Sequence, residues 1–233
     1  MSKRLLVYVE GATEEIFVIR ILRNHLLQHG VTVDRPILAA TSMMPSGQRG
    51  GFVNWPAMEA DLQTLFATDT DPNLRFTTLL DTYAMPPNAP GYPGLSSSNI
   101  REVSEVDAVE AALANRFSEP RFVPYLQRHE FEALVLAHPP ALHAVFPEFA
   151  QALAELERSI AGIRNAEDIN DGRTTHPSAR LNQAIPTYEA LKASNGLFVL
   201  LEAGLANVRP RCPRFDAWLK RWEQWGAQPC FPD

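Results

Sequence analysis

Acidic side chains recur at or just beyond the apolar runs of this sequence, and they are the residues best placed to do chemistry. They are Glu10 after residues 5–9, Asp81 after residues 76–80, and Glu130 and Glu132 after residues 122–126. The carboxyl ends of parallel strands meet at one edge of a sheet, so we expect these carboxylates to lie close together. Like charges tolerate such crowding chiefly beside a cation, and carboxylate oxygens suit Mg2+ or Mn2+. The pattern therefore predicts a divalent-cation site.

A helix start lies beside the first of these strand ends. Gly11 forms a turn, Thr13 can cap the helix that follows, and Glu14 occupies its first turn, near the positive end of the helix dipole. Glu14 therefore joins Glu10 as a candidate ligand. Taken singly, each carboxylate has a more common use, since Glu14 favours a helix N-terminus and Asp81 begins a turn. The recurrence at three strand ends is what favours a site.

The elements that would position these residues alternate in type. Strand-length apolar runs and stretches of helical periodicity follow one another as β-α-β-α-β, which is typical of a parallel sheet with helices on its faces. The expected strands are residues 5–9, 31–40, 76–80 and 122–126; the expected helices are residues 14–27, 55–66, 102–117, 141–160 and 197–205, with another starting at Ser178. Residues 43–51 and 86–94 are expected as loops. The predicted fold class is α/β, with a mainly parallel sheet flanked by helices.

The second half of the chain differs from the first. It carries helical patterns but no further clear strand, and a polar, turn-rich stretch interrupts it at residues 169–181. We therefore expect an α/β core over residues 1–137 and a mostly helical C-terminal extension over residues 138–233, packed on that core.

Bulk composition narrows the classes of protein. The 233 residues are 45% hydrophobic, which is ample for a buried core. Cys212 and Cys230 form neither a disulfide framework nor a metal-binding pair. No apolar segment is long enough to span a bilayer and no signal peptide is evident, so the sequence predicts a cytoplasmic protein with free thiols.

The charge is uneven along the chain. The formal net charge of −6 argues against a general nucleic-acid coat protein, which would usually be basic. Residues 207–221 nevertheless carry five basic side chains against Asp216 alone. A local basic patch is one interpretation, and an ordinary solvated surface is the commoner one.

Several segments carry a resemblance to a known family. They are the opening VEGATEE from Val9, QRHEFEAL from Gln127, PSARL from Pro177 and CPRFDAWL from Cys212. The opening VEGATEE, with the strand-end aspartate of LLDTY, resembles the Toprim domain of topoisomerases, primases, ribosomal-RNA maturases and overcoming-lysogenization-defect nucleases. The closer resemblance is to an uncharacterised Toprim-related bacterial family, often encoded beside ABC- or AAA-type ATPases in defence-like loci.

The resemblance implies roles for particular residues. Glu10 matches the general acid/base or metal-binding glutamate, Glu14 matches the helix-borne glutamate of the nuclease branch, and Asp81 matches the first aspartate of a DxD motif. Tyr83 stands where the second aspartate would be and cannot be a carboxylate ligand. Glu130 or Glu132 would supply the missing charge, and both would point to one side if the backbone there is extended.

Phosphodiester chemistry also requires a cation to offset phosphate charge. Lys192 and Arg180 are the candidates, and a lysine has this role in related Toprim nucleases; taken alone, Lys192 has the commoner interpretation of a surface residue. His129, beside the acidic cluster, would orient a carboxylate rather than bind metal.

The leading prediction is therefore a Mg2+- or Mn2+-dependent nuclease acting on DNA or RNA, the effector of an ATPase partner that the resemblance alone implies. The alternative is a catalytically degenerate Toprim-like module that binds or restrains a partner protein, as Tyr83 and the negative charge suggest. A third class is metal-dependent hydrolysis or transfer on a small phosphorylated substrate. The chain has no P-loop of its own.

Two weaker signals complete the analysis. His25 and His29 lie four residues apart on a predicted helix and could bind zinc, but with no third ligand evident a surface or capping role is favoured. Phe215, Trp218, Trp222 and Trp225 form a stripe at helical spacing. Core packing is the favoured interpretation, before partner docking and base stacking.

Overall fold

The computed structural model of the chain describes residues 2–39, 41–43, 49–86, 88–92, 103–170 and 174–230. Two compact units divide the chain: unit 1 is formed by residues 1–126 and 220–233, and unit 2 by residues 127–219. The sequence predicts a division after residue 137. The boundary lies instead between residues 126 and 127, and residues 220–233 belong to unit 1. In the described residues, no helix is long and apolar enough to cross a membrane.

Unit 1 is built on a mainly parallel sheet of the Rossmann-like kind, which confirms the predicted α/β class. Strand β1 (Lys3–Val9) lies between β2 (Val31–Val33) and β6 (Leu74–Asp81), and β6 also pairs with β7 (Phe122–Val123). Strand β1 also pairs with β3 (Ile37–Leu38), and the pairs β1–β2, β1–β3, β1–β6 and β6–β7 are all parallel. The register places Val9 beside Leu79, so β1 and β6 end at the same edge.

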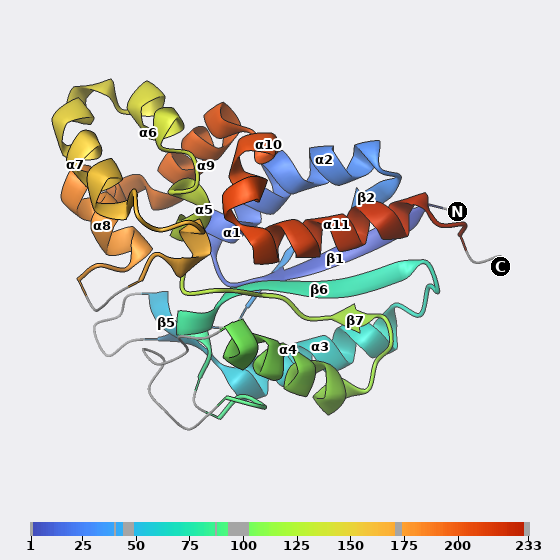
Figure 1. Cartoon of the computed structure of the whole chain (residues 1–233). Helices are drawn as coiled ribbons and strands as arrows, with labels where there is room; N and C mark the ends of the chain where they lie inside the picture. The colour runs from blue at the N-terminus through green and yellow to red at the C-terminus, as the bar shows by residue number, and fades with distance from the viewer. Residues whose placement is uncertain are drawn as a thin grey trace. The chain divides into compact units, whose positions relative to one another are not determined.

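The central strands are buried because helices cover both faces of the sheet. Leu5, Val7 and Val9 are wholly buried, as expected for strands inside an α/β layer. Helices α1 (Ala12–Phe17) and α2 (Arg23–Gln28) cover one face, and α3 (Trp55–Thr68) and α4 (Val103–Phe117) cover the other (Figure 1). Met58 and Leu62 of α3 pack with Val109 and Leu113 of α4 in the core.

Several element boundaries depart from the expected ones, and prolines account for two of them. The strand expected at 31–40 is split into β2 and β3 (Ile37–Leu38), with Pro36 in the gap. The strand expected at 122–126 is split into β7 and β8 (Leu126–Gln127) at Pro124. There the Thr78 hydroxyl accepts the Tyr125 N–H at 2.9 Å and donates to the Tyr125 carbonyl at 2.7 Å, which replaces the ladder bonds a proline cannot make.

Two further corrections concern the first half of the chain. Within the stretch expected as a loop at residues 43–51, Met43 and residues 49–51 belong instead to an antiparallel pair, β4 (Thr41–Met43) with β5 (Arg49–Val53), and residues 44–48 lie outside the described residues. The helix expected over residues 14–27 is present but interrupted by a π-helical turn, η1 (Val18–Leu22). Part of the loop expected at 86–94 lies outside the described residues.

The last helix, α11 (Pro213–Ala227), returns the end of the chain to unit 1. The buried Lys3 amine donates to the carbonyl oxygens of Trp225, Gly226 and Gln228, at the negative end of the α11 dipole. The aromatic stripe of this helix is buried, with Phe215 0% and Trp222 2% exposed. Core packing, the favoured interpretation of that stripe, is confirmed.

Unit 2 is mostly helical, as the sequence predicts. The helix expected over residues 141–160 is divided at Pro147, and the helix expected at 197–205 begins earlier. Its elements are α5 (Glu132–Val135), α6 (Pro139–Val145), η4 (Pro147–Phe149), α7 (Ala150–Ile160), η5 (Ala166–Asp168), α8 (Pro177–Ala184), η6 (Glu189–Leu191), α9 (Lys192–Ala203), α10 (Leu205–Val208), η7 (Arg209–Arg211) and the start of α11.

Candidate functional site

Two predicted site residues, Glu10 and Asp81, meet at the carboxyl edge of the sheet in unit 1. Glu10 follows β1 directly and Asp81 is the last residue of β6. The Asp81 backbone N–H donates to Glu10 Oε2 at 3.2 Å. Asp81 is 8% exposed, whereas Glu10 is half-buried. The parallel register of β1 and β6 therefore brings the Glu10 carboxylate to the backbone of Asp81.

Glu14 lies beside this pair through the turn that follows β1. Its carboxylate accepts the Gly11 N–H at 3.0 Å, so it links the first turn of α1 to the residue that precedes the helix. The expectation that Thr13 caps the helix is wrong, since Gly11 is the capping residue and Thr13 lies inside α1. Glu14 is 5% exposed. This contact is typical of a glutamate that stabilises a helix N-terminus, which is the more common use of such a residue.

Tyr83 lies in a single 3-10 turn, η2 (Thr82–Ala84), directly after Asp81. It is half-buried. Burial, followed by the charge of the Tyr83 phenol, raises the pKa of the neighbouring Tyr92 to about 12. The donor set at this edge therefore consists of glutamate and aspartate oxygens without a second DxD acid. Carboxylate oxygens of this kind fit a hard divalent cation, which favours all-oxygen coordination.

Glu130 and Glu132 belong to unit 2 and face different partners there. The expected extended backbone is absent: His129 has a φ of 62°, and Phe131 is helical and precedes α5. The two carboxylates are therefore held separately. Glu130 is engaged by residues around the start of α8, and Glu132 by Lys192 at the start of α9.

Glu130 serves as a cap for α8, because the side chain of the N-cap residue, His176, makes no capping bond to the helix. Its Oε2 accepts the Ser178 N–H at 2.9 Å and contacts His176 Nδ1 at 3.0 Å, and its Oε1 accepts the Ser178 hydroxyl at 3.0 Å. Burial alone would raise the pKa of Glu130, but the bonds from His176 and Ser178 outweigh it and lower that pKa below its ordinary value.

Glu132 is wholly buried and forms an ion pair with Lys192, Nζ to Oε2, at 3.2 Å. Lys192 keeps 31% of its side chain exposed. Burial raises the pKa of the nearby Tyr188 well above its usual range, and the negative charge of Glu132 adds to that effect. Lys192, which the sequence predicts to bind phosphate, therefore forms an ion pair with a carboxylate of its own unit.

His129 also lies in unit 2, beside Arg128, which pairs with Asp168. The Asn170 side-chain amide nitrogen lies 3.1 Å from His129 Nδ1, where an unprotonated Nδ1 can accept its N–H. Burial, followed by the Arg128 charge, lowers the pKa of His129 to about 4. The ring is thus neutral at physiological pH, and the amide of Asn170 is a partner of Nδ1; that His129 orients a carboxylate stays a prediction.

Arg180, the second predicted phosphate-binding residue, is 9% exposed. Its guanidinium donates to the Thr175 carbonyl at 2.5 Å and to the Ser159 hydroxyl at 3.0 Å. These bonds tie α8 and the segment before it to α7. The contacts are those of a residue that holds unit 2 together.

Sequence reasoning missed several residues of these clusters. His176 and Ser178 contact Glu130, and the buried Glu167 accepts the N–H groups of Arg214 and Phe215 at 2.8 and 3.0 Å, which caps α11. Burial raises the pKa of Glu167. Both capped helices begin with proline, at Pro177 and Pro213, which marks a helix start in the sequence. Nothing in the sequence near either helix start indicates the distant glutamate that caps it.

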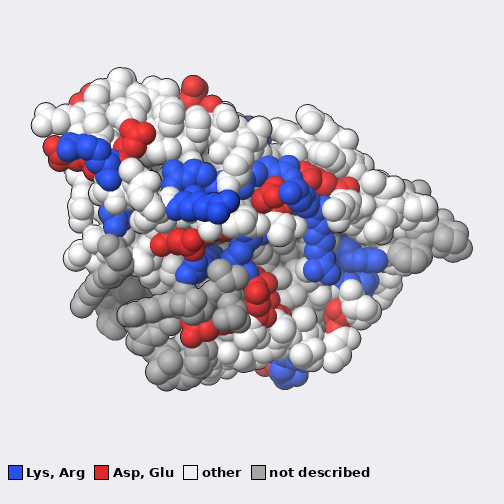
Figure 2. Space-filling view, viewed as in Figure 1, with Lys and Arg blue, Asp and Glu red and all other residues white. Residues whose placement is uncertain are grey.

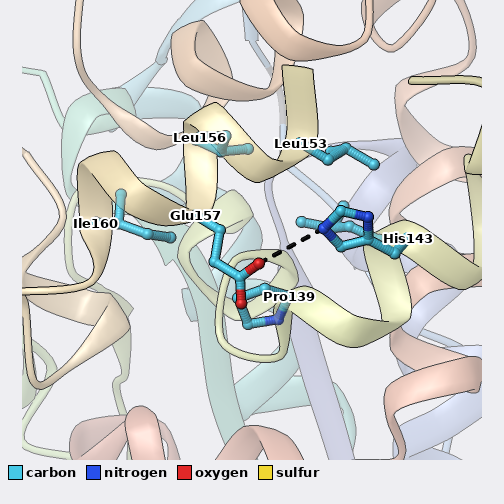
Figure 3. A pocket seen from close by; sticks show the side chains of 7 residues that line it. Pro139, His143, Leu153, Leu156, Glu157 and Ile160 are labelled. Atoms are coloured by element: carbon cyan, nitrogen blue, oxygen red, sulfur yellow. Dashed lines mark ion pairs between the residues drawn. The ribbon is translucent and has the colours of Figure 1, made fainter. Parts of the chain in front are cut away.

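The surface offers two further features. A shallow hollow between α6 and α7 in unit 2 is lined mainly by apolar side chains, with one ion pair between His143 and Glu157 at 3.5 Å (Figure 3). None of the predicted catalytic residues lines it. Lys and Arg side chains are interspersed with acidic ones along α11 (Figure 2). Within the basic stretch, Arg209 pairs with Asp216 at 2.5 Å and Arg211 donates to the Ile163 carbonyl at 2.7 Å.

Comparisons with known proteins give one finding. A family model described as "Domain of unknown function (DUF4276)" matches residues 9–223. No curated protein and no solved structure matches the chain significantly. The matched range spans both the sheet-edge carboxylates and the clusters of unit 2, and it carries no activity with it. The Toprim resemblance and nuclease chemistry therefore remain predictions.

Proposed function

The chain belongs to the DUF4276 family, and we propose that it is a divalent-metal-dependent phosphodiesterase that cuts nucleic acid at the carboxyl edge of its sheet. The observation that carries the proposal is the contact between the Asp81 N–H and Glu10 Oε2, at 3.2 Å, across the ends of two adjacent parallel strands. Ligands of open α/β sheets gather at this edge. Two carboxylates held there by the strand register supply oxygens suited to Mg2+ or Mn2+.

In this proposal, Glu10 and Asp81 hold the ion and Glu14 supports them from the first turn of α1. When bound, the ion lowers the pKa of a coordinated water and neutralises charge on the phosphate oxygens. Glu10, the more exposed carboxylate of the pair, is the group that would take up the proton of the attacking water. Lys192 and Arg180 are left out of the proposed catalytic set because their observed bonds stay within unit 2.

A DNA or RNA substrate and an ABC- or AAA-type ATPase partner are parts of the proposal that rest on the resemblance. The partner would act as the trigger of a two-component system in which this chain is the effector. An assay with the chain alone and with a candidate ATPase plus ATP would separate intrinsic cleavage from triggered cleavage.

A second candidate function is a binding module without catalysis. The observation that favours it is Tyr83 after the strand-end aspartate, together with the helix-start contact of Glu14 with the Gly11 N–H. A binding module would keep its partner when Glu10 and Asp81 are neutralised. A catalytic site would lose its activity.

The first test is calorimetric titration of Mn2+ into the wild type, Glu10→Gln and Asp81→Asn. Glutamine keeps an oxygen that can accept the Asp81 N–H, so the variant removes charge with little change in structure. We expect one saturable binding event that both variants abolish. Glu155→Gln, at an exposed position of α7, is the matched control and should bind Mn2+ as the wild type does.

The second test is cleavage of labelled DNA and RNA, single- and double-stranded, with Mn2+, Mg2+ or EDTA. We expect metal-dependent cleavage that falls by at least about 100-fold in Glu10→Gln, the range for loss of a general base. Cleavage that survives in Glu10→Gln would contradict the assignment. Binding of Mn2+ without cleavage of any nucleic acid, alone or with an ATPase, would favour a small phosphorylated substrate.

A further inference from the structure

We propose that His25, His29 and Glu223 form a binding site for a late first-row divalent ion such as Zn2+, joining α2 to α11 within unit 1. This site is separate from the sheet-edge carboxylates and goes beyond the proposed function. The sequence shows the two histidines at helical spacing but gives no hint of the third ligand, because Glu223 lies 194 positions after His29. The fold brings it to them.

The contacts carry the proposal. His25 Nε2 lies 2.6 Å from Glu223 Oε1, and His29 Nε2 lies 4.0 Å from the same oxygen. The two imidazole rings have their centroids 4.9 Å apart. One ligand atom from each residue can be chosen so that all lie within 4.8 Å of one another. Two imidazoles and a carboxylate converging in this way are the ligand set of many zinc sites that keep a fourth position for water.

The rearrangement that a metal requires is small. Ligand atoms around a tetrahedral zinc ion are about 3.4 Å apart, as zinc–nitrogen distances of about 2.1 Å dictate. The His25–Glu223 contact would lengthen and the His29–Glu223 contact would shorten, each by less than about 1 Å. Side-chain exposures of 19%, 41% and 14% for His25, His29 and Glu223 give an ion a path from solvent and leave room for water.

The backbone around the site holds the two helices in place. A Cβ on Gly226 would lie 2.0 Å from the His29 carbonyl oxygen, so only glycine permits this approach of α11 to the end of α2. Gly226 lies about one helical turn after Glu223, and His29 lies about one helical turn after His25. The glycine contact therefore sets the helices in a register that faces Glu223 toward both histidines.

The chemistry of the ligands selects the class of ion. Imidazole nitrogens suit Zn2+, Cu2+, Ni2+ and Co2+, whereas Mg2+ and Mn2+ favour oxygen ligands. The site should therefore discriminate against the ions proposed for the sheet edge. An ion bound here would crosslink the last helix of the chain to the second helix and stabilise the folded unit.

An ordinary histidine–glutamate ion pair is the simpler interpretation, and the chain supplies a matched control for it. His143 and Glu157 form such a pair in unit 2, at 3.5 Å. The substitution His29→Ala distinguishes the two interpretations. It keeps the His25–Glu223 bond intact while it removes one metal ligand, and His29 is exposed enough for the variant to fold.

The experiment is calorimetric titration of Zn2+ into EDTA-treated, dialysed protein carrying Asp81→Asn, which removes a carboxylate of the other proposed site. We compare that protein with versions that also carry His29→Ala or His143→Ala, checking each fold by circular dichroism. We expect one saturable site, weakened at least tenfold by His29→Ala and unchanged by His143→Ala. Zn2+ should also raise the Tm of the parent protein and leave that of the His29→Ala version unmoved.

Two outcomes would overturn the proposal. One is equal Zn2+ affinity in the parent and the His29→Ala version, which would place the ion elsewhere. The other is absence of saturable binding in the parent, which would leave an ordinary ion pair. X-ray absorption of the zinc-loaded protein should show two imidazole ligands and no sulfur, which also excludes Cys230 as the source of binding.

Discussion

Glu10 in unit 1 differs in its contacts from three buried or half-buried glutamates of unit 2. In unit 2, Glu130 and Glu167 each accept N–H groups at the start of a helix, and Glu132 pairs with Lys192. In unit 1, Glu10 accepts the N–H of Asp81 at the edge of the sheet where two strands end. Carboxylates of the first kind hold elements of the fold in place. The second arrangement places Glu10 beside Asp81 at an edge where α/β proteins bind ligands.

The difference shows that position after a strand does not define a role. Glu10 and Glu130 both follow apolar runs and both belong to segments that resemble the Toprim-related family. Their contacts separate them, since Glu130 meets His176 and Ser178 whereas Glu10 meets the end of the neighbouring strand. Substitutions should therefore cost stability in unit 2 and binding or activity in unit 1.

The largest stability effect should come from Lys192→Met. The substitution removes a cation from the wholly buried carboxylate of Glu132. We expect the free energy of unfolding in urea to fall by about 2–4 kcal/mol, the range for a broken buried pair with some allowance for the exposed lysine. An ordinary surface lysine, the commoner interpretation of Lys192 from the sequence, would show no such loss. Adding Glu132→Gln should recover part of the loss, whereas a fully stable Lys192→Met would mean that other groups compensate the charge.

The next effect is a dependence on pH that belongs to unit 2. The pKa of His129 is about 4 in the folded state and ordinarily 6.5, so the unfolded chain takes up its proton first as pH falls. This contribution to stability is complete above pH 6.5 and is lost as pH falls toward 4. Between pH 7 and pH 5 it amounts to about 2 kcal/mol.

The variant His129→Asn tests this source of pH dependence, because asparagine tolerates the positive φ of the position. Urea unfolding of the variant at pH 7 and pH 5 should show a smaller difference than the wild type. Equal differences in the two proteins would assign the pH dependence to other groups.

A smaller effect should separate charge from hydrogen bonding at Glu130. Glu130→Ala removes the acceptor that caps α8 and should lower stability by about 1–2 kcal/mol, the usual cost of a lost cap. Glu130→Gln keeps an acceptor for the Ser178 N–H and should cost less. Thermal unfolding measures both, with Glu148→Ala at an exposed position as the control. Equal losses in the two Glu130 variants would show that the charge matters more than the cap.

The smallest stability effect should be that of Glu10→Gln. The carboxylate is half-buried and its amide replacement can still accept the Asp81 N–H, so unfolding free energy should change by less than about 0.5 kcal/mol. The same variant is expected to lose Mn2+ binding. If Glu10→Gln lowered the free energy of unfolding as much as Lys192→Met does, Glu10 would also have a structural role, which would contradict the predicted difference between the two units.

The fold class follows from the sequence because its signals are local. The buried run at residues 5–9 and the β-rich run ending at Asp81 identify parallel strands, and helical periodicity identifies what covers them. Local signals fail where the partner is distant. Nothing near Pro124 reveals that the Thr78 hydroxyl replaces two ladder bonds, and the antiparallel β4–β5 pair lies in a stretch whose glycines favour a loop.

The candidate site was predictable to the same extent. Parallel register alone brings Glu10 and Asp81 together, and that register follows from two adjacent strands. Glu130 and Glu132 were expected at the same site only on the condition of an extended backbone, and the positive φ of His129 removes that condition. The third member of the histidine cluster, Glu223, depends on the return of the last helix, which no spacing in the sequence encodes.

The amine of Lys3 makes its bonds to a segment 222 residues further along the chain. At synthesis rates of about 5–20 residues per second, the ribosome needs roughly 10–45 s to deliver that segment. During this interval the nascent first strand lacks the carbonyls that will bury its lysine. During synthesis, unit 1 therefore cannot complete its fold until the last helix has been made. In refolding from denaturant, both ends of the chain are present from the start.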